Sequence, residues 1–199
     1  MIVVILLLLL IGPYFGPVPA LLSSRFSINT SVLILLAGFI VSLSIILVAA
    51  LRLDGIAFSQ FRAAFRDLGL GKPAGWPALV VGAVVGLAWG ALFLSSILQF
   101  VPDTNIMEIS AFRIVAALIA AVGTVMEDLI TRGYLMNRLQ QIAVPNWLQA
   151  VISALLFAVY HTIWGFNPFS FVFSVVYGLI LAGLFLWGKR SLTDRKSVV

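Results

Sequence analysis

Long uncharged stretches alternate with short charged ones along this chain. No charged residue occurs in 1–24, 26–51, 73–102, 114–126 or 139–188. A helix needs about 20 apolar residues to cross the hydrocarbon core of a bilayer. The pattern therefore predicts an all-α, polytopic transmembrane helix bundle. The expected spans are 2–22, 32–51, 77–100, 109–140, 147–164 and 169–187.

Composition strengthens this interpretation. Hydrophobic residues make up 62% of the chain and charged residues 10%, with a mean hydropathy of +1.17, whereas about a quarter of the residues in a soluble domain are charged. We expect a single integral-membrane domain over 1–199. The first span is expected to be retained, because it lacks the basic start of a secretion signal and contains Pro13, Pro17 and Pro19.

The placement of the basic residues predicts orientation. They gather in the 52–72 connection, at Arg138 and in the 189–196 segment. With six spans, all three places lie on the side of the N-terminus, which the positive-inside rule assigns to the cytoplasm. We therefore expect a multi-pass protein of the plasma membrane with both termini cytoplasmic. The net charge of +5 then reflects topology, so the expected partner is the lipid bilayer and not nucleic acid.

A shorter amphipathic segment follows the second expected span. Phe58, Phe61, Phe65 and Leu68 recur at intervals of three and four residues, which is typical of a helix lying flat in the membrane interface. The segment can anchor the chain on the lipid surface, and a docking surface for a lipidated substrate is the alternative.

One cluster of charges lies inside an apolar stretch, in Glu127-Asp128-Leu129-Ile130-Thr131-Arg132-Gly133. Charge inside a membrane is costly and points to function. Asp128 precedes Arg132 by four residues, so the two can form an intrahelical ion pair. Glu127 has no evident local partner, and an unpaired carboxylate in an apolar site suits the role of a general base.

His161, the single histidine, lies in the fifth expected span. A lone histidine on an apolar helix can be a packing residue or a catalyst. Glu127 comes 14 residues before Gln141, and His161 comes 14 residues after Trp147. At 1.5 Å per residue, both lie about 21 Å from the same turn. The spacing predicts that they face each other at one depth, within direct or one-water reach.

These motifs resemble a known family. Glu-Asp-x-x-x-Arg-Gly, followed on the next helix by Phe157-x-x-x-His161, is similar to the first two motifs of the CAAX protease and bacteriocin-processing membrane proteases, or abortive-infection family. This family includes the type II CAAX prenyl endopeptidases. Its first motif is usually Glu-Glu-x-x-x-Arg, so Asp128 replaces the second glutamate. The resemblance covers about 72–192.

The resemblance implies peptide-bond hydrolysis inside the membrane, with a prenylated or hydrophobic peptide as substrate. By motif, Glu127 activates water, His161 positions it or shares its proton, and Asp128 and Arg132 hold the first motif in shape. The family is commonly described as metalloproteases, and zinc on Glu127 and His161 is the minority alternative. A catalytic zinc normally takes three protein ligands, so a metal-independent mechanism is favoured.

The sequence departs from the family in one respect. Family members continue into a helix with His-x-x-x-Asn or His-x-x-x-Asp, whereas this chain ends at Val199 without a second histidine. Losing an oxyanion donor costs about a hundred- to a thousandfold in rate, so reduced activity is expected. One alternative is an impaired or truncated relative acting as an immunity or interaction protein. Another is a proton-coupled carrier, which the lack of an internal repeat disfavours.

Overall fold

The structure, a computed structural model, describes residues 2–70, 77, 80–88, 90–91 and 110–192. Helices make up its regular structure, and no strand occurs in this part of the chain, so the predicted all-α class is confirmed. Within the same residues, four helical stretches are long and apolar enough to cross a membrane. They are Ile2–Ser23, Ile28–Leu53, Ala111–Gln141 and Pro168–Gly188.

The third and fifth expected spans are not among these four helical stretches. Half of the third, 77–100, lies outside the described residues, as do Lys72 and the 193–199 end of the chain. The fifth corresponds to α8 (Asn146–Thr162), which has 17 residues. At 1.5 Å per residue it rises about 26 Å, a little short of the roughly 30 Å hydrocarbon core.

The first span is helical but irregular. It consists of α1 (Ile2–Leu6), a π-helical turn (Leu7–Ile11), a 3₁₀ turn (Gly12–Phe15) and α2 (Pro17–Ser23). Proline has no N–H to donate to the helix, and the chain adapts before Pro13 by bonding Gly12 N–H back to the Leu7 carbonyl. Leu7 and Ile11 are fully buried, so this span forms part of the core.

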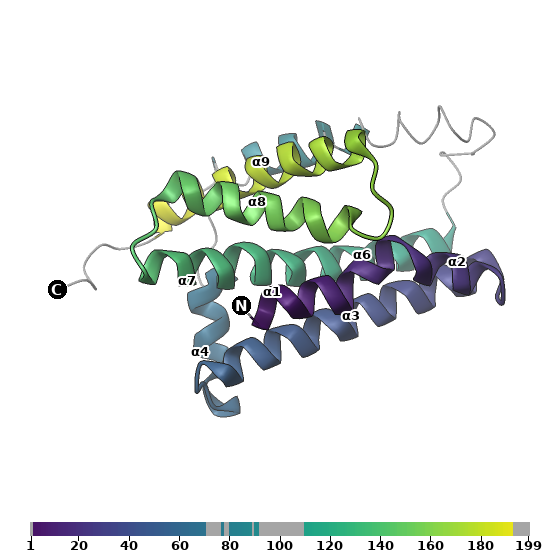
Figure 1. Cartoon of the computed structure of the whole chain (residues 1–199), viewed down its shortest axis with the longest axis horizontal. Coiled ribbons are helices and arrows are strands. Elements are labelled where there is room, and N and C mark those ends of the chain that lie inside the picture. Colours follow the sequence, from purple (N-terminus) through teal and green to yellow (C-terminus); the bar gives the residue numbers. More distant parts are fainter. Residues whose placement is uncertain (1, 71–76, 78–79, 89, 92–109, 193–199) are drawn as a thin grey trace.

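The core lies where the first span, α3 (Ile28–Leu53) and the charged helix meet. Figure 1 shows α1 and α2 running along α3, with α6 (Ala111–Asp128) and α8 beside them. The buried apolar side chains come mainly from α1 and the π-helical turn after it, from α3, from the turn that follows α6, and from α8. They include Leu7, Ile11, Leu43, Ile46, Leu47, Ile130 and Tyr160.

The charged helix is continuous from α6 (Ala111–Asp128) through a π-helical turn (Leu129–Tyr134) to α7 (Leu135–Gln141). A tight turn then leads into α8, and α9 (Pro168–Leu192) packs along it. At Gly178 the two helices approach so closely that an added Cβ would lie 2.8 Å from Ala154 Cα. The short turn makes α7 and α8 antiparallel, as the sequence predicted.

The segment after α3 crosses one end of the bundle (Figure 1). It consists of a 3₁₀ turn (Phe58–Gln60), α4 (Phe61–Phe65) and a π-helical turn (Arg66–Leu70). Phe58 is 66% exposed but Leu68 only 7%, and Phe61 and Phe65 pack against the core. The bundle itself thus covers most of this apolar face and leaves Phe58 exposed.

The connections alternate between the two ends of the bundle. Figure 1 shows the α3–α4 connection and the α7–α8 turn at one end, and the α2–α3 and α8–α9 turns at the other. The elements that meet at the first end carry Arg52, Arg62, Arg66 and Arg138, whereas Arg25 lies in the α2–α3 turn and Arg113 near the start of α6. This arrangement agrees with the basic end that the sequence predicted.

Candidate active site

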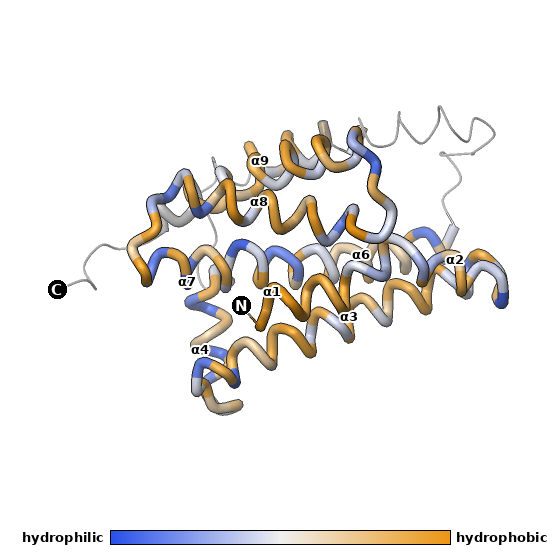
Figure 2. The backbone as a smooth tube through the Cα atoms, viewed as in Figure 1, coloured by the Kyte–Doolittle hydropathy of each residue, from blue (hydrophilic) through white to orange (hydrophobic). Residues whose placement is uncertain are grey.

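The charged cluster lies inside the bundle, where α6 continues into its π-helical turn. Figure 2 shows this hydrophilic stretch in the middle of helices that are otherwise largely hydrophobic. Glu127 is 7% exposed and Arg132 is 2% exposed. Buried charges need partners in an apolar medium, so the contacts of these two side chains define the site.

Glu127 and His161 face each other across α6 and α8. Their Oε1 and Nε2 atoms are 3.7 Å apart, so the predicted proximity is confirmed. His161 Nδ1 lies 2.8 Å from the Phe157 carbonyl oxygen. A carbonyl can only accept, so Nδ1 carries the hydrogen, and Nε2 of the neutral ring presents a lone pair toward Glu127. A single water can donate one hydrogen to each of these two acceptors.

Aromatic rings enclose the imidazole. The Phe157 ring centroid lies 4.1 Å from that of His161, and the Phe15 ring centroid lies 4.0 Å from it. The sequence pointed to Phe157 through its motif, but it gave no sign of Phe15, which comes from the first span. Phe15 and His161 are 146 positions apart, so their contact is a product of tertiary packing.

Tyr160 is a second residue that the sequence did not single out. Its side chain is fully buried, and its hydroxyl donates a hydrogen bond to Glu127 Oε1. Two signals were available: it neighbours His161 in the chain, and a buried tyrosine hydroxyl normally requires a hydrogen-bond partner. Glu127 therefore has a hydrogen-bond partner on α8, although the sequence around Glu127 shows no evident partner for it.

Arg132 and Asp128 form the predicted ion pair. Arg132 Nη1 also donates to Thr131 Oγ1 at 3.0 Å, and its guanidinium lies over the Phe157 ring, 4.8 Å from the centroid. Within the described residues, Nε and Nη2 of Arg132 have no hydrogen-bond partner. The ring face thus supplies part of the stabilisation of this buried cation.

The π-helical turn after Glu127 leaves one backbone carbonyl without the N–H donor of a regular α-helix. Leu135 N–H bonds to the Ile130 carbonyl, five residues back, so the Thr131 carbonyl loses the donor that an α-helix would supply. Ser153 of α8 replaces it, with its Oγ donating at 2.9 Å. This hydrogen bond connects the two helices that carry Glu127 and His161.

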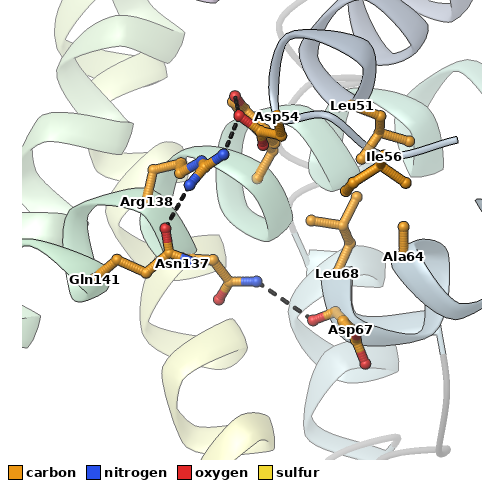
Figure 3. Close-up of a pocket in the computed structure, with 10 residues that line it drawn as sticks. Leu51, Asp54, Ile56, Ala64, Asp67, Leu68, Asn137, Arg138 and Gln141 are labelled. Atoms are coloured by element: carbon orange, nitrogen blue, oxygen red, sulfur yellow. Dashed lines mark hydrogen bonds and ion pairs between the residues drawn. The ribbon is translucent and has the colours of Figure 1, made fainter.

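A separate polar pocket of about 250 Å³ lies at the α3–α4 end of the bundle. Asp54 pairs there with Arg138 and accepts from the Tyr134 hydroxyl at 3.2 Å. Figure 3 shows Arg138 between Asp54 and Gln141, while Asn137 donates to the Asp67 carbonyl at 3.3 Å. Neither Glu127 nor His161 lines this pocket, so its groups hold the helix ends together and are not part of the candidate site.

The donor set does not suit the minority alternative of zinc. Among the described residues, no three histidine, cysteine, aspartate or glutamate side chains converge. Glu127 and His161 supply two donors, while Asp128 is engaged with Arg132. A catalytic zinc takes three protein ligands, one more than Glu127 and His161 supply.

The fold and the buried pair define the class: a helical membrane protein with a carboxylate and an imidazole facing each other inside the bundle. Residues 109–193 match the family model described as type II CAAX prenyl endopeptidase Rce1-like. Both motifs lie within this stretch, and the match confirms the resemblance to the CAAX-type intramembrane protease family. The searches of curated proteins and of solved structures gave no match.

Proposed function

We propose that this chain is an intramembrane endopeptidase that hydrolyses a peptide bond with water held between Glu127 and His161. The observation that carries the proposal is the 3.7 Å separation of Glu127 Oε1 and His161 Nε2. Because Nδ1 is committed to the Phe157 carbonyl, Nε2 is free to accept a hydrogen bond from that water.

In the proposed reaction, the water oxygen attacks the carbonyl carbon of the scissile bond while ionised Glu127 takes one of its protons. His161 Nε2 holds the second hydrogen and so directs the oxygen lone pair. The tetrahedral intermediate then collapses. Its C–N bond breaks, and the proton on Glu127 passes to the leaving nitrogen, giving a new carboxyl group and a free amine.

Arg132 and Asp128 act in this scheme by holding the helix that presents Glu127. Their ion pair spans one turn, and the guanidinium rests on Phe157, the residue whose carbonyl fixes His161. Both partners of the water are thus supported by one connected set of contacts. Such support matters because a misplacement of about 1 Å can cost a hundredfold in rate.

The proposed substrate is a prenylated or otherwise hydrophobic peptide that reaches the site from the membrane. The family match supports this class. Phe15 is 37% exposed and touches His161, so the imidazole lies just behind a side chain at the surface of the bundle. We also propose that the α3–α4 end faces the cytoplasm, where its arginines are favoured.

The test is cleavage of a farnesylated CAAX peptide by the purified chain in detergent or liposomes. We expect hydrolysis by the wild type, with one ¹⁸O atom from labelled water in the new carboxyl group. Glu127→Gln should abolish it, because an amide cannot take the proton. Asp67→Asn makes the same chemical change at an exposed position and is the matched control.

Two results would overturn the proposal. Cleavage that survives Glu127→Gln would remove Glu127 from the mechanism. A folded wild-type chain that cleaves no prenylated or hydrophobic peptide would favour a non-catalytic role in the membrane.

A further inference from the structure

We propose that Tyr160 is a positioning residue that fixes the carboxylate of Glu127 for attack by water. This inference rests on the proposed function and deepens it, because it assigns a role to a side chain at a position that the second motif leaves unspecified. It concerns the reaction step and not the binding of the peptide.

The first argument is the geometry at one oxygen. Glu127 Oε1 accepts the hydrogen of the Tyr160 hydroxyl and lies 3.7 Å from His161 Nε2. Residues that are adjacent on a helix diverge by about 100°, so the two side chains approach this oxygen from different directions. Tyr160 therefore supplies a direct donor, while His161 stays at a distance that a water can bridge.

The second argument is the freedom of the glutamate side chain. The last torsion of a glutamate joins tetrahedral and planar carbons and has a broad, weakly preferred range. Packing around the aliphatic part of Glu127 consequently does not fix the plane of its carboxylate. A hydrogen bond from a rigid donor does, since it fixes one of the two oxygens.

The third argument is the rigidity of that donor. Tyr160 is fully buried, and its ring packs against Phe157 at 5.6 Å and against Phe15 at 6.4 Å between centroids. The same two phenylalanines flank His161. One aromatic cluster thus positions both the His161 imidazole and the Tyr160 phenol. The phenol in turn positions the Glu127 carboxylate through its hydrogen bond.

Removing the hydroxyl should slow the reaction step and leave peptide binding intact. The Tyr160 hydroxyl points at Glu127 and is buried away from the surface, so it offers no contact to the peptide. We expect Tyr160→Phe to lower kcat by about ten- to a hundredfold, the range associated with a displaced catalytic group. KM should change by less than about twofold.

The matched control is Tyr134→Phe. Tyr134 also donates its hydroxyl to a carboxylate, Asp54 Oδ1 at 3.2 Å, but in the polar pocket at the end of the bundle. Both variants keep the ring and lose one hydrogen bond, so both should stay folded, with the larger fall in melting temperature in Tyr160→Phe because its partner carboxylate is buried. Only Tyr160→Phe should lower kcat. Equal kcat for Tyr160→Phe and wild type, or a kcat loss shared by both variants, would overturn the proposal.

A second measurement is independent of activity. The infrared carboxylate band of Glu127, identified as the band lost in Glu127→Gln, should shift in Tyr160→Phe and stay in place in Tyr134→Phe. An unshifted band would show that Tyr160 does not bind this carboxylate and would overturn the inference. If the band shifts in Tyr160→Phe but the wild-type chain cleaves nothing, the contact is upheld and the proposed function is rejected.

Discussion

The hydroxyl of Ser153 donates a 2.9 Å hydrogen bond to the backbone carbonyl of Thr131. The contact joins α8 to the π-helical turn that follows Glu127. Because the π-helical turn leaves this carbonyl without its usual donor, the interaction between the helices satisfies a buried group and also sets the register of Glu127 against His161.

Replacing Ser153 with alanine should therefore destabilise the bundle. The buried carbonyl would lose its donor, at a cost of about 1–2 kcal/mol in the free energy of unfolding. Unfolding in detergent, followed by circular dichroism, measures this cost. Thr124→Ala is the control, because the exposed Thr124 hydroxyl donates to Ala120 of its own helix. Equal losses in both variants would show that the contact between the helices adds nothing.

Gly178→Ala should also lower the free energy of unfolding, by about 1–3 kcal/mol, because overpacking forces helices apart. An added Cβ would lie 2.8 Å from Ala154 Cα, a backbone atom that cannot rotate away. In Gly183→Ala, on the same helix, the new Cβ meets no atom within 4 Å. This control should remain within about 0.5 kcal/mol of wild type. A stable Gly178→Ala protein would contradict the close approach of α8 and α9.

Ala143→Gly should stabilise the chain. Ala143 lies in the turn after α7 with a φ of 59°, and the Val144 N–H bonds to the Leu139 carbonyl across this left-handed residue. Glycine adopts that conformation without the steric cost that a side chain brings. We expect a gain of about 0.5–1 kcal/mol, whereas Ala63→Gly, within α4, should lose a similar amount. A loss at Ala143 as well would rule out strain at this turn.

Single cysteines will test the orientation. The chain contains no cysteine, so Ser59→Cys and Ser24→Cys each introduce one unique thiol. These positions lie at opposite ends of the bundle (Figure 1). If the positive-inside rule sets the topology, an impermeant maleimide added to intact cells should label Cys at position 24 and spare position 59. The reverse pattern would place the arginine-rich end outside.

Chelators will test the metal-independent mechanism. The described residues offer two donors at the candidate site where zinc needs three. Cleavage of the prenylated peptide should therefore stay within about twofold of the untreated rate after treatment with 1,10-phenanthroline and dialysis. The non-chelating 1,7 isomer controls for effects of the phenanthroline ring. Activity that is lost with the 1,10 isomer and returns with added zinc would restore the metal alternative.

The sequence by itself determined what depends on distance along one helix or on hydropathy. Uncharged stretches specify membrane helices because lipid cannot satisfy exposed backbone groups. The four-residue spacing of Asp128 and Arg132 fixed their ion pair. Equal distances from one short turn placed Glu127 and His161 at one depth, because the rise per residue of a helix is constant.

The tertiary structure alone decided how the helices rotate and what each side chain meets. It brought Phe15 against His161 and directed the Tyr160 hydroxyl to Glu127. It placed the Ser153 hydroxyl where it donates to the Thr131 carbonyl. It also turned Leu68 toward the core instead of lipid. These contacts depend on how each helix is rotated about its own axis, and packing across the whole bundle sets that rotation. A hydropathy pattern in which nearly every helix face is apolar carries little information about it.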